Sequence, residues 1–287
     1  MESQVPAAIE WTWRLADGQL RRTEPLAAGI VNITSDSMYE GARSGTPERA
    51  IEDGRRLVAE GFEMLDVGAV AARSGPPVAA ADEAAPLIPA IEGLAGEGVP
   101  ISADTFVPEV ARRALDAGAV AINDIGGGSE EMFDLVAERG CGYVLMHIEG
   151  PPRQDRVAPA YDDVIEHLLH WFSERVSAAA EHGVEAEQIA LDPGLDFDLS
   201  LEDDLRILAR LGELRELGRP LYVSLSRKDF LGAVLAGSWA ERRDSSEREW
   251  ATAAAAALAV AGGADLLRLH DASALQAMRV AAAVSSG

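Results

Sequence analysis

Residues 245–270, SSEREWATAAAAALAVAGGADLLRLH, contain a complete helix-to-strand unit. Ser246 and Glu249 have the spacing of a capping box, which predicts the start of a helix in the alanine-rich run that follows. The Gly-Gly pair at 262–263 comes after that run, and glycine is favoured where a helix ends. The apolar run at 265–270 then predicts a buried strand. The stretch therefore predicts an α/β fold.

The same unit recurs along the chain. Eight apolar strand candidates alternate with helix patterns, and they are Leu26–Ile33, Glu63–Ala69, Pro100–Asp104, Ala119–Asn123, Tyr143–Ile148, Gln188–Asp192, Leu221–Ser226 and Asp265–His270. Thr46 followed by Pro47 predicts a helix start. Eight units in roughly 250 residues are typical of a (β/α)₈ TIM barrel. A doubly wound open sheet is the alternative, but no Gly-x-Gly-x-x-Gly follows the first strand candidate.

The N-terminal segment has a different pattern. EWTWRLADGQLRR, residues 10–22, alternates apolar and polar residues around Asp17-Gly18, which predicts a β-hairpin. We expect this hairpin to close the bottom of the barrel. Since no low-complexity linker divides the chain, we predict one domain over residues 1–287, with the hairpin at about 8–24 and the barrel at about 26–284.

Composition limits the function classes. The formal net charge of −23 argues against a nucleic-acid or anionic-membrane binder, because phosphate affinity needs clustered cations. No run of eighteen apolar residues and no signal-peptide pattern occur, so we expect a cytoplasmic protein. The single cysteine, Cys141, excludes an intrachain disulfide and opens a predicted strand, where a buried and inert thiol is expected.

The predicted strands share one feature: each ends in polar or charged residues. These are Asn32, Asp66, Asp104, Asn123-Asp124, His147, Asp192, Ser226-Arg227-Lys228, and Arg268 with His270. In a TIM barrel these ends form the active-site face. Asp104, Asn123 and Asp192 offer acceptors for a planar heterocycle with adjacent N–H groups. Arg268 and His270, two residues apart on one strand, together with Asn32 are suited to a phosphate or diphosphate.

Lys228 is the only lysine of the chain, since the other 24 basic residues are arginines. A compositional preference for arginine would explain one surviving lysine without any function. Its predicted place at the end of the seventh strand, facing carboxylates, favours a functional interpretation, because an unpaired buried ammonium is costly.

Other chemistries have weaker support. His147 and His270 are isolated in the sequence, with no His-Glu-x-x-His spacing, so we expect no dedicated zinc site. Ser226 lies outside any Gly-x-Ser-x-Gly context, which argues against a serine nucleophile.

The sequence resembles the dihydropteroate synthase family over nearly its full length. The matching segments, in chain order, are GIVNITSDSMYEGA, DVGAVAARSG, ISADT, INDI, MHIEG, LDPGLDF, SLSRKDFLG and LRLHDASALQAM. The resemblance implies a TIM barrel that condenses 6-hydroxymethyl-7,8-dihydropterin diphosphate with p-aminobenzoate, releasing diphosphate and giving 7,8-dihydropteroate. It also implies a Mg²⁺ ion and a homodimer.

The resemblance further implies residue roles. Asp104, Asn123, Asp192 and Lys228 would bind the pterin, and Lys228, Asp104 and Asp192 would be catalytic. Asn32, Arg73, Arg268 and His270 would bind the diphosphate, with Asn32 assisting Mg²⁺. Phe197 and Ser226 would lie near p-aminobenzoate.

The chain departs from the family pattern at three places. In the second loop, the family's Glu-Ser-Thr-Arg-Pro is replaced by Val70-Ala71-Ala72-Arg73-Ser74. After the sixth strand, two family glycines are replaced by Asp196 and Asp198, and a family lysine is replaced by Leu199. In the seventh strand, a family glycine is replaced by Ser224. We expect these changes to affect p-aminobenzoate binding more than pterin binding.

Two other functions remain open. One is a diverged paralogue that binds pterin or diphosphate without efficient turnover. The other is a pterin-dependent methyltransferase domain, although the chain has no Asp-x-His-x-x-Gly segment.

Overall fold

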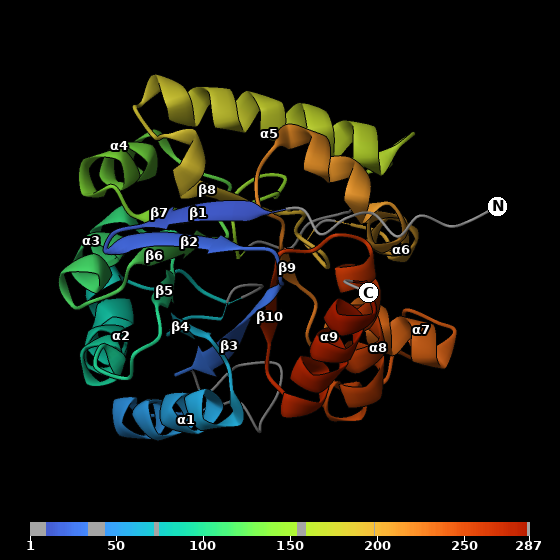
Figure 1. The fold of residues 1–287 in the computed structure, drawn as a ribbon, viewed down its shortest axis with the longest axis horizontal. Helices are drawn as coiled ribbons and strands as arrows, with labels where there is room; N and C mark the ends of the chain where they lie inside the picture. Colours follow the sequence, from blue (N-terminus) through green and yellow to red (C-terminus); the bar gives the residue numbers. More distant parts are fainter. Residues whose placement is uncertain (1–9, 34–43, 72–74, 154–158, 198, 286–287) are drawn as a thin grey trace.

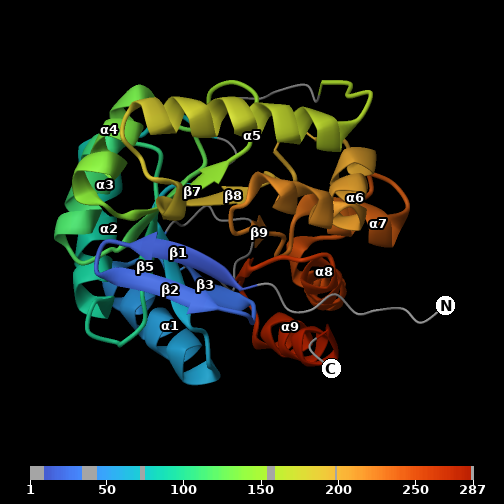
Figure 2. The same cartoon turned by 45° about the horizontal axis from the view of Figure 1, so that its top comes forward.

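A computed structural model describes residues 10–33, 44–71, 75–153, 159–197 and 199–285. Figures 1 and 2 show a ring of helices around a barrel of strands, with the hairpin lying across it. The barrel strands are β3 (Leu26–Asn32), β4 (Met64–Gly68), β5 (Ile101–Asp104), β6 (Ala121–Asp124), β7 (Gly142–Met146), β8 (Ile189–Asp192), β9 (Tyr222–Ser224) and β10 (Leu266–Leu269).

The eight strands form one parallel sheet in the order β8-β7-β6-β5-β4-β3-β10-β9. A parallel bridge between Leu191 and Leu221 joins the two ends of that order. There the Leu191 N–H donates to the carbonyl of Pro220 at 2.9 Å. The predicted (β/α)₈ barrel is thus confirmed, and every predicted strand is found within two residues of its expected start and end.

Nine helices cover the barrel within the described residues: α1 (Pro47–Glu60), α2 (Ala80–Leu94), α3 (Pro108–Asp116), α4 (Glu130–Arg139), α5 (Val164–Glu181), α6 (Leu201–Ala209), α7 (Asp229–Ala236), α8 (Glu249–Ala261) and α9 (Ala272–Ser285). Thr46 caps α1 as predicted, since its hydroxyl accepts from the Arg49 N–H at 3.4 Å. The predicted capping box at Ser246 and Glu249 is wrong. Asp244 and Glu247 form it instead, on a 3₁₀ turn that precedes α8.

The N-terminal hairpin closes the barrel end at which the strands begin. It consists of β1 (Trp11–Leu15) and β2 (Gly18–Arg22), paired antiparallel as predicted. Trp13 is fully buried, and its indole N–H donates to the carbonyl of Gln188 at 2.7 Å, just before β8. Trp13 also belongs to an apolar cluster with barrel residues, including Met64 and Tyr222. This apolar end leaves the opposite, C-terminal end for polar side chains.

Two expectations about the rest of the chain can be compared with the structure. Cys141 is buried just before β7, as predicted, and burial raises the pKa of its thiol to about 12. None of the helices in the described segments has the length and apolar character needed to cross a membrane.

Candidate functional site

Asp66 lies at the centre of the polar network inside the barrel. It is fully buried on β4 and accepts three hydrogen bonds from side chains of three other barrel strands. The donors are the Ser102 hydroxyl at 2.5 Å, the Asn123 amide at 3.1 Å and the Arg268 guanidinium. The sequence placed Asp66 among the strand-end residues without a role. The structure shows that it orients Asn123 and Arg268.

Arg268, on β10, lies between two carboxylates. Its guanidinium contacts Asp66 and donates to Asp104 Oδ2 at 2.6 Å. Burial raises the pKa of Asp104 to about 7, since desolvation and the nearby Asp66 charge outweigh the opposing effect of Arg268. Sequence reasoning grouped Arg268 with the diphosphate residues and Asp104 with the pterin residues. In the structure the two form one ion pair, so the predicted groups are in direct contact.

Lys228 occupies a buried position after β9. Its ammonium donates to the carbonyl of Leu195 at 2.5 Å and lies 4.9 Å from the centre of the Phe197 ring. Burial lowers the pKa of Lys228, and the nearby carboxylate of Asp192 opposes that shift. An ammonium has three N–H donors, and among the described residues one hydrogen bond is made. This geometry supports the functional interpretation of the single lysine.

Asp192 ends β8 at the same barrel end. Its carboxylate accepts from the Gly194 N–H at 2.8 Å and is almost fully buried. Burial raises the pKa of Asp192 to about 6, although Lys228 and the Gly194 N–H favour the ionised form. A buried carboxylate near a buried ammonium can hold a ligand that presents both donors and acceptors. The four predicted pterin residues thus lie at the same end of the barrel.

Asp196, which replaces a family glycine, has a structural role. Its carboxylate accepts from the backbone N–H groups of Asp229 and Phe230, the second at 2.9 Å, and so caps α7. Its φ of 68° lies in the left-handed region, where aspartate is tolerated better than most residues. Leu199 is buried in the apolar core, while Asp198 lies outside the described residues.

The described residues predicted to contact p-aminobenzoate or diphosphate lie at the C-terminal end of the barrel. Ser226 Oγ accepts from the His270 N–H at 3.2 Å and lies 2.9 Å from His270 Nδ1. Burial, with Arg268 and Arg227 nearby, lowers the pKa of His270 to about 3, so the imidazole is neutral in the free protein. Phe197 is largely buried beside Lys228. Asn32 ends β3 and is partly exposed.

The described residues on either side of positions 72–74 are contacted by an arginine that sequence reasoning did not single out. Arg153, after β7, donates to the carbonyl of Ala71 and, at 2.9 Å, to the carbonyl of Pro76. Arg73, which is predicted to bind diphosphate, lies outside the described residues. No pattern in the sequence links Arg153 to Ala71, because the two lie 82 residues apart.

Arg227, in the motif next to Lys228, supports the backbone. Its guanidinium makes two hydrogen bonds to the Asp271 carboxylate, both at 2.8 Å, and a third to the Ser245 carbonyl. Its φ of 56° is left-handed, and the side-chain contacts hold it in that conformation. Arg227 therefore positions the turn that presents Lys228.

His147 is isolated in the sequence but not in the fold. His147 Nε2 lies 3.1 Å from His167 Nε2, and both lie near Glu149. His167 lies in the first turn of α5, twenty residues further along the chain. Only the fold brings the two imidazoles together.

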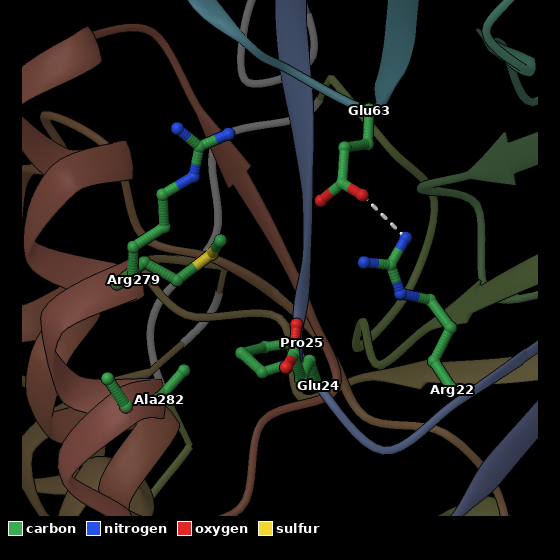
Figure 3. Close-up of a pocket in the computed structure, with 8 residues that line it drawn as sticks. Arg22, Glu24, Pro25, Glu63, Arg279 and Ala282 are labelled. Atoms are coloured by element: carbon green, nitrogen blue, oxygen red, sulfur yellow. Dashed lines mark hydrogen bonds and ion pairs between the residues drawn. The ribbon is translucent and has the colours of Figure 1, made fainter.

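A cavity of about 400 Å³ lies at the opposite end of the barrel, between the hairpin and α9. Figure 3 shows Arg22 pointing to Glu63, with which it forms an ion pair of 2.6 Å. Arg279 and Ala282 line the α9 side. This partly exposed cavity shares no residue with the polar network of Asp66.

The sequence and fold are similar to those of known proteins. The profile of a family described as "Pterin binding enzyme" matches residues 28–270. The dihydropteroate synthase of Synechocystis sp. is 39% identical over 251 residues, which cover 86% of this chain and 85% of that protein. The dihydropteroate synthase of Mycobacterium leprae is 37% identical, with 85% and 87% covered.

Two solved structures have the same fold. The Yersinia pestis dihydropteroate synthase with a sulfonamide drug complex superposes with a TM-score of 0.89 at 29% identity, covering 96% of this chain and 99% of that one. The Xanthomonas albilineans dihydropteroate synthase in complex with 7,8-dihydropteroate gives a TM-score of 0.81 at 36% identity, with the same coverage.

Proposed function

The chain belongs to the dihydropteroate synthase family of pterin-binding enzymes, and we propose that it performs the family's condensation with the buried network around Asp66 as its pterin site. In that reaction 6-hydroxymethyl-7,8-dihydropterin diphosphate and p-aminobenzoate give 7,8-dihydropteroate and diphosphate. The chain is accordingly a transferase.

The observation that carries the proposal is the grouping of ionisable residues inside the barrel. Asp104, Asp192 and Lys228 are buried together at the end where TIM barrels bind substrate. Buried charges without mutual ion pairing destabilise a protein, and perturbed pKa values of this kind are typical of functional sites. A pterin offers N–H donors to the acceptor oxygens of Asp192 and Asn123. It also offers a carbonyl oxygen and a ring nitrogen as acceptors for the Lys228 ammonium.

Catalysis follows from the charges that develop in the reaction. Ionisation of the carbon–oxygen bond leaves a cationic pterin methylene and a diphosphate anion. The carboxylates of Asp104 and Asp192 stabilise the cation, while Arg268 and His270 at the barrel mouth, together with Arg73, bind the anion. Charges that are fixed before reaction lower the barrier because they need no reorganisation.

The residues present fit a Mg²⁺ ion with the diphosphate. Mg²⁺ prefers oxygen ligands and takes many of them from substrate phosphates and water, so one protein oxygen from Asn32 is sufficient. When bound, the ion neutralises the leaving diphosphate. Asn32 would hold it at the partly exposed end of β3, and His270 would donate a hydrogen bond to the diphosphate from its neutral ring.

p-Aminobenzoate binds beside Phe197 and Ser226 in the proposed site. The Phe197 ring lies next to Lys228 and can stack on an aromatic amine that approaches the pterin methylene. The solved Xanthomonas albilineans dihydropteroate synthase with 4-aminobenzoic acid is 38% identical to this chain, with a TM-score of 0.85, which supports an amine of this class.

The test is a coupled diphosphate-release assay with and without p-aminobenzoate, with dihydropteroate measured in parallel. We expect release that depends on the amine and yields one dihydropteroate per diphosphate. A chain that binds the pterin diphosphate by calorimetry but forms no product would instead be the non-catalytic paralogue.

We further propose a cytoplasmic homodimer that forms through α8 and α9. These helices lie side by side in Figure 1 and expose apolar side chains, namely Trp250 (79%) and Leu258 (63%) on α8, and Val280 (65%) and Val284 (73%) on α9. A second copy that covers this face would remove it from water. Light scattering tests the proposal: Leu258→Glu is expected to give monomers, and a wild-type monomer would contradict it.

A further inference from the structure

His147, Glu149 and His167 form a three-residue cluster, here called the His147 triad, beside the pterin site. His147 follows β7, Glu149 lies two residues later, and His167 is in the first turn of α5. Three atoms converge: His147 Nε2 lies 3.1 Å from His167 Nε2 and 3.6 Å from Glu149 Oε1, and the last two lie 2.9 Å apart.

These separations match the spacing of ligands around a metal ion. Imidazole nitrogen and carboxylate oxygen bind zinc at about 2.0–2.2 Å, so ligands at tetrahedral angles lie about 3.3 Å from one another. The three distances in the triad scatter on both sides of that value. One cation can therefore contact all three atoms without movement of the backbone.

Hydrogen bonding explains the triad less well. The 3.6 Å separation between His147 and Glu149 is too long for a hydrogen bond. One proton on His167 Nε2 can be donated to His147 or to Glu149 but not fully to both. A cation at the centre would satisfy all three lone pairs at once, and it would do so beside His147, whose side chain is fully buried.

Aromatic neighbours hold the two imidazoles in place. The Trp171 ring packs edge-on against His147, with 5.0 Å between ring centres, and Tyr161 lies 4.4 Å from His167. Rings that are packed in this way lose little further freedom on binding a metal. The side chains of Glu149 and His167 remain 39% and 28% exposed, which gives a cation access from solvent.

We propose that the His147 triad binds a zinc-class divalent cation and joins the end of β7 to α5. Two imidazoles and one carboxylate favour Zn²⁺ or Co²⁺ over Mg²⁺, which prefers oxygen ligands, so this site is distinct from the diphosphate-bound ion at Asn32. Three protein ligands leave at least one coordination position for water. The site is also joined to Asp192, whose carboxylate is proposed to bind the pterin. The backbone N–H of His147 donates to the backbone carbonyl of Asp192 at 2.8 Å.

The experiment uses the full chain after treatment with a chelator. Zn²⁺ is titrated by calorimetry in a buffer that contains Mg²⁺, and Co²⁺ is titrated by its visible absorption, which reports coordination by protein ligands. We expect one site per chain for both ions. His167→Gln is expected to raise the Kd by more than about tenfold, the loss typical even of an outer-shell partner.

His170→Gln is the matched control. His170 lies on the same helix, is 75% exposed and, among the described residues, pairs with Glu174 at 3.3 Å, so its removal is expected to leave the Kd unchanged. Circular dichroism of both variants without metal checks that α5 is intact. A stoichiometry of zero, or equal affinity in wild type and His167→Gln, would overturn the proposal, and so would an equal loss in His170→Gln. None of these outcomes depends on turnover of the pterin substrate.

Discussion

Asp192→Asn is expected to stabilise the free protein at neutral pH while it abolishes pterin binding. Burial raises the pKa of Asp192 to about 6 from an ordinary 3.8, so the folded chain binds the proton more tightly than the unfolded chain does. The stability that the tighter proton binding of the folded chain contributes is fully present below pH 3.8 and is lost as the pH rises through about 6. At about 1.4 kcal/mol per pKa unit, the ionised carboxylate destabilises the fold by about 3 kcal/mol at pH 8.

The assay is chemical denaturation of wild type and Asp192→Asn from pH 4 to pH 8. The amide keeps an oxygen that can accept from Gly194, so the pH dependence of the difference reports the titration of Asp192, including its interaction with the Lys228 ammonium. We expect the stability of the variant relative to wild type to increase by about 2.4 kcal/mol across that range, because the unfolded carboxyl is already partly ionised at pH 4. A difference that stays constant with pH would refute the reasoning, because it would mean that Asp192 titrates normally in the fold.

Calorimetry with the pterin alcohol completes the test. The wild-type affinity is expected to fall as the pH is lowered below about 6, since only the ionised carboxylate accepts from two pterin N–H groups. Asp265→Asn is the control, because Asp265 is also a buried carboxyl with a raised pKa but precedes β10 at the other barrel end. It is expected to leave the pterin affinity unchanged.

Three further changes test other parts of the site. Lys228→Arg is expected to lower kcat by about a hundredfold or more in the coupled assay, because a planar guanidinium does not fit the compact contact to Leu195; near-normal turnover would contradict this. Arg268→Ala is expected to weaken the pterin diphosphate more than the pterin alcohol in calorimetry, and equal losses would argue against a diphosphate contact. Asp196→Gly is expected to lower the free energy of unfolding by about 1 kcal/mol through the lost cap of α7, and an unchanged denaturation midpoint would show that the cap contributes nothing.

The sequence predicts the barrel well because the fold repeats a local pattern. Each strand is a short apolar run, and four of the α-helices end at a glycine, as at Gly61 and Gly140, whose left-handed φ values confirm their role as helix caps. The one capping box that was misplaced, at Ser246, fails because Asp244 two residues earlier competes for the same role. Local signals of this kind need no knowledge of distant contacts.

The partners within the site are not predictable in the same way. The strand ends place Asp66 and Arg268 at the barrel mouth, but their contact depends on how far a guanidinium reaches across the interior. His147 and His167 come from a strand end and a helix, so no sequence spacing indicates that they meet. Arg153 reaches Ala71 across 82 residues for the same reason. Residue type and strand position predict membership of the site, whereas pairing requires the three-dimensional structure.

The two ends of the barrel have opposite energetics. At the end closed by the hairpin, Trp13 and its neighbours are buried in apolar contact, which stabilises the fold through the removal of apolar surface from water. At the other end the barrel encloses Asp104, Asp192 and Lys228, each with a pKa shifted by burial toward its neutral form. In the proposed function, a substrate that offers donors to the carboxylates and acceptors to the ammonium would favour the charged forms of these groups. The apolar end therefore offsets a polar end at which burial disfavours the charged forms in the free protein.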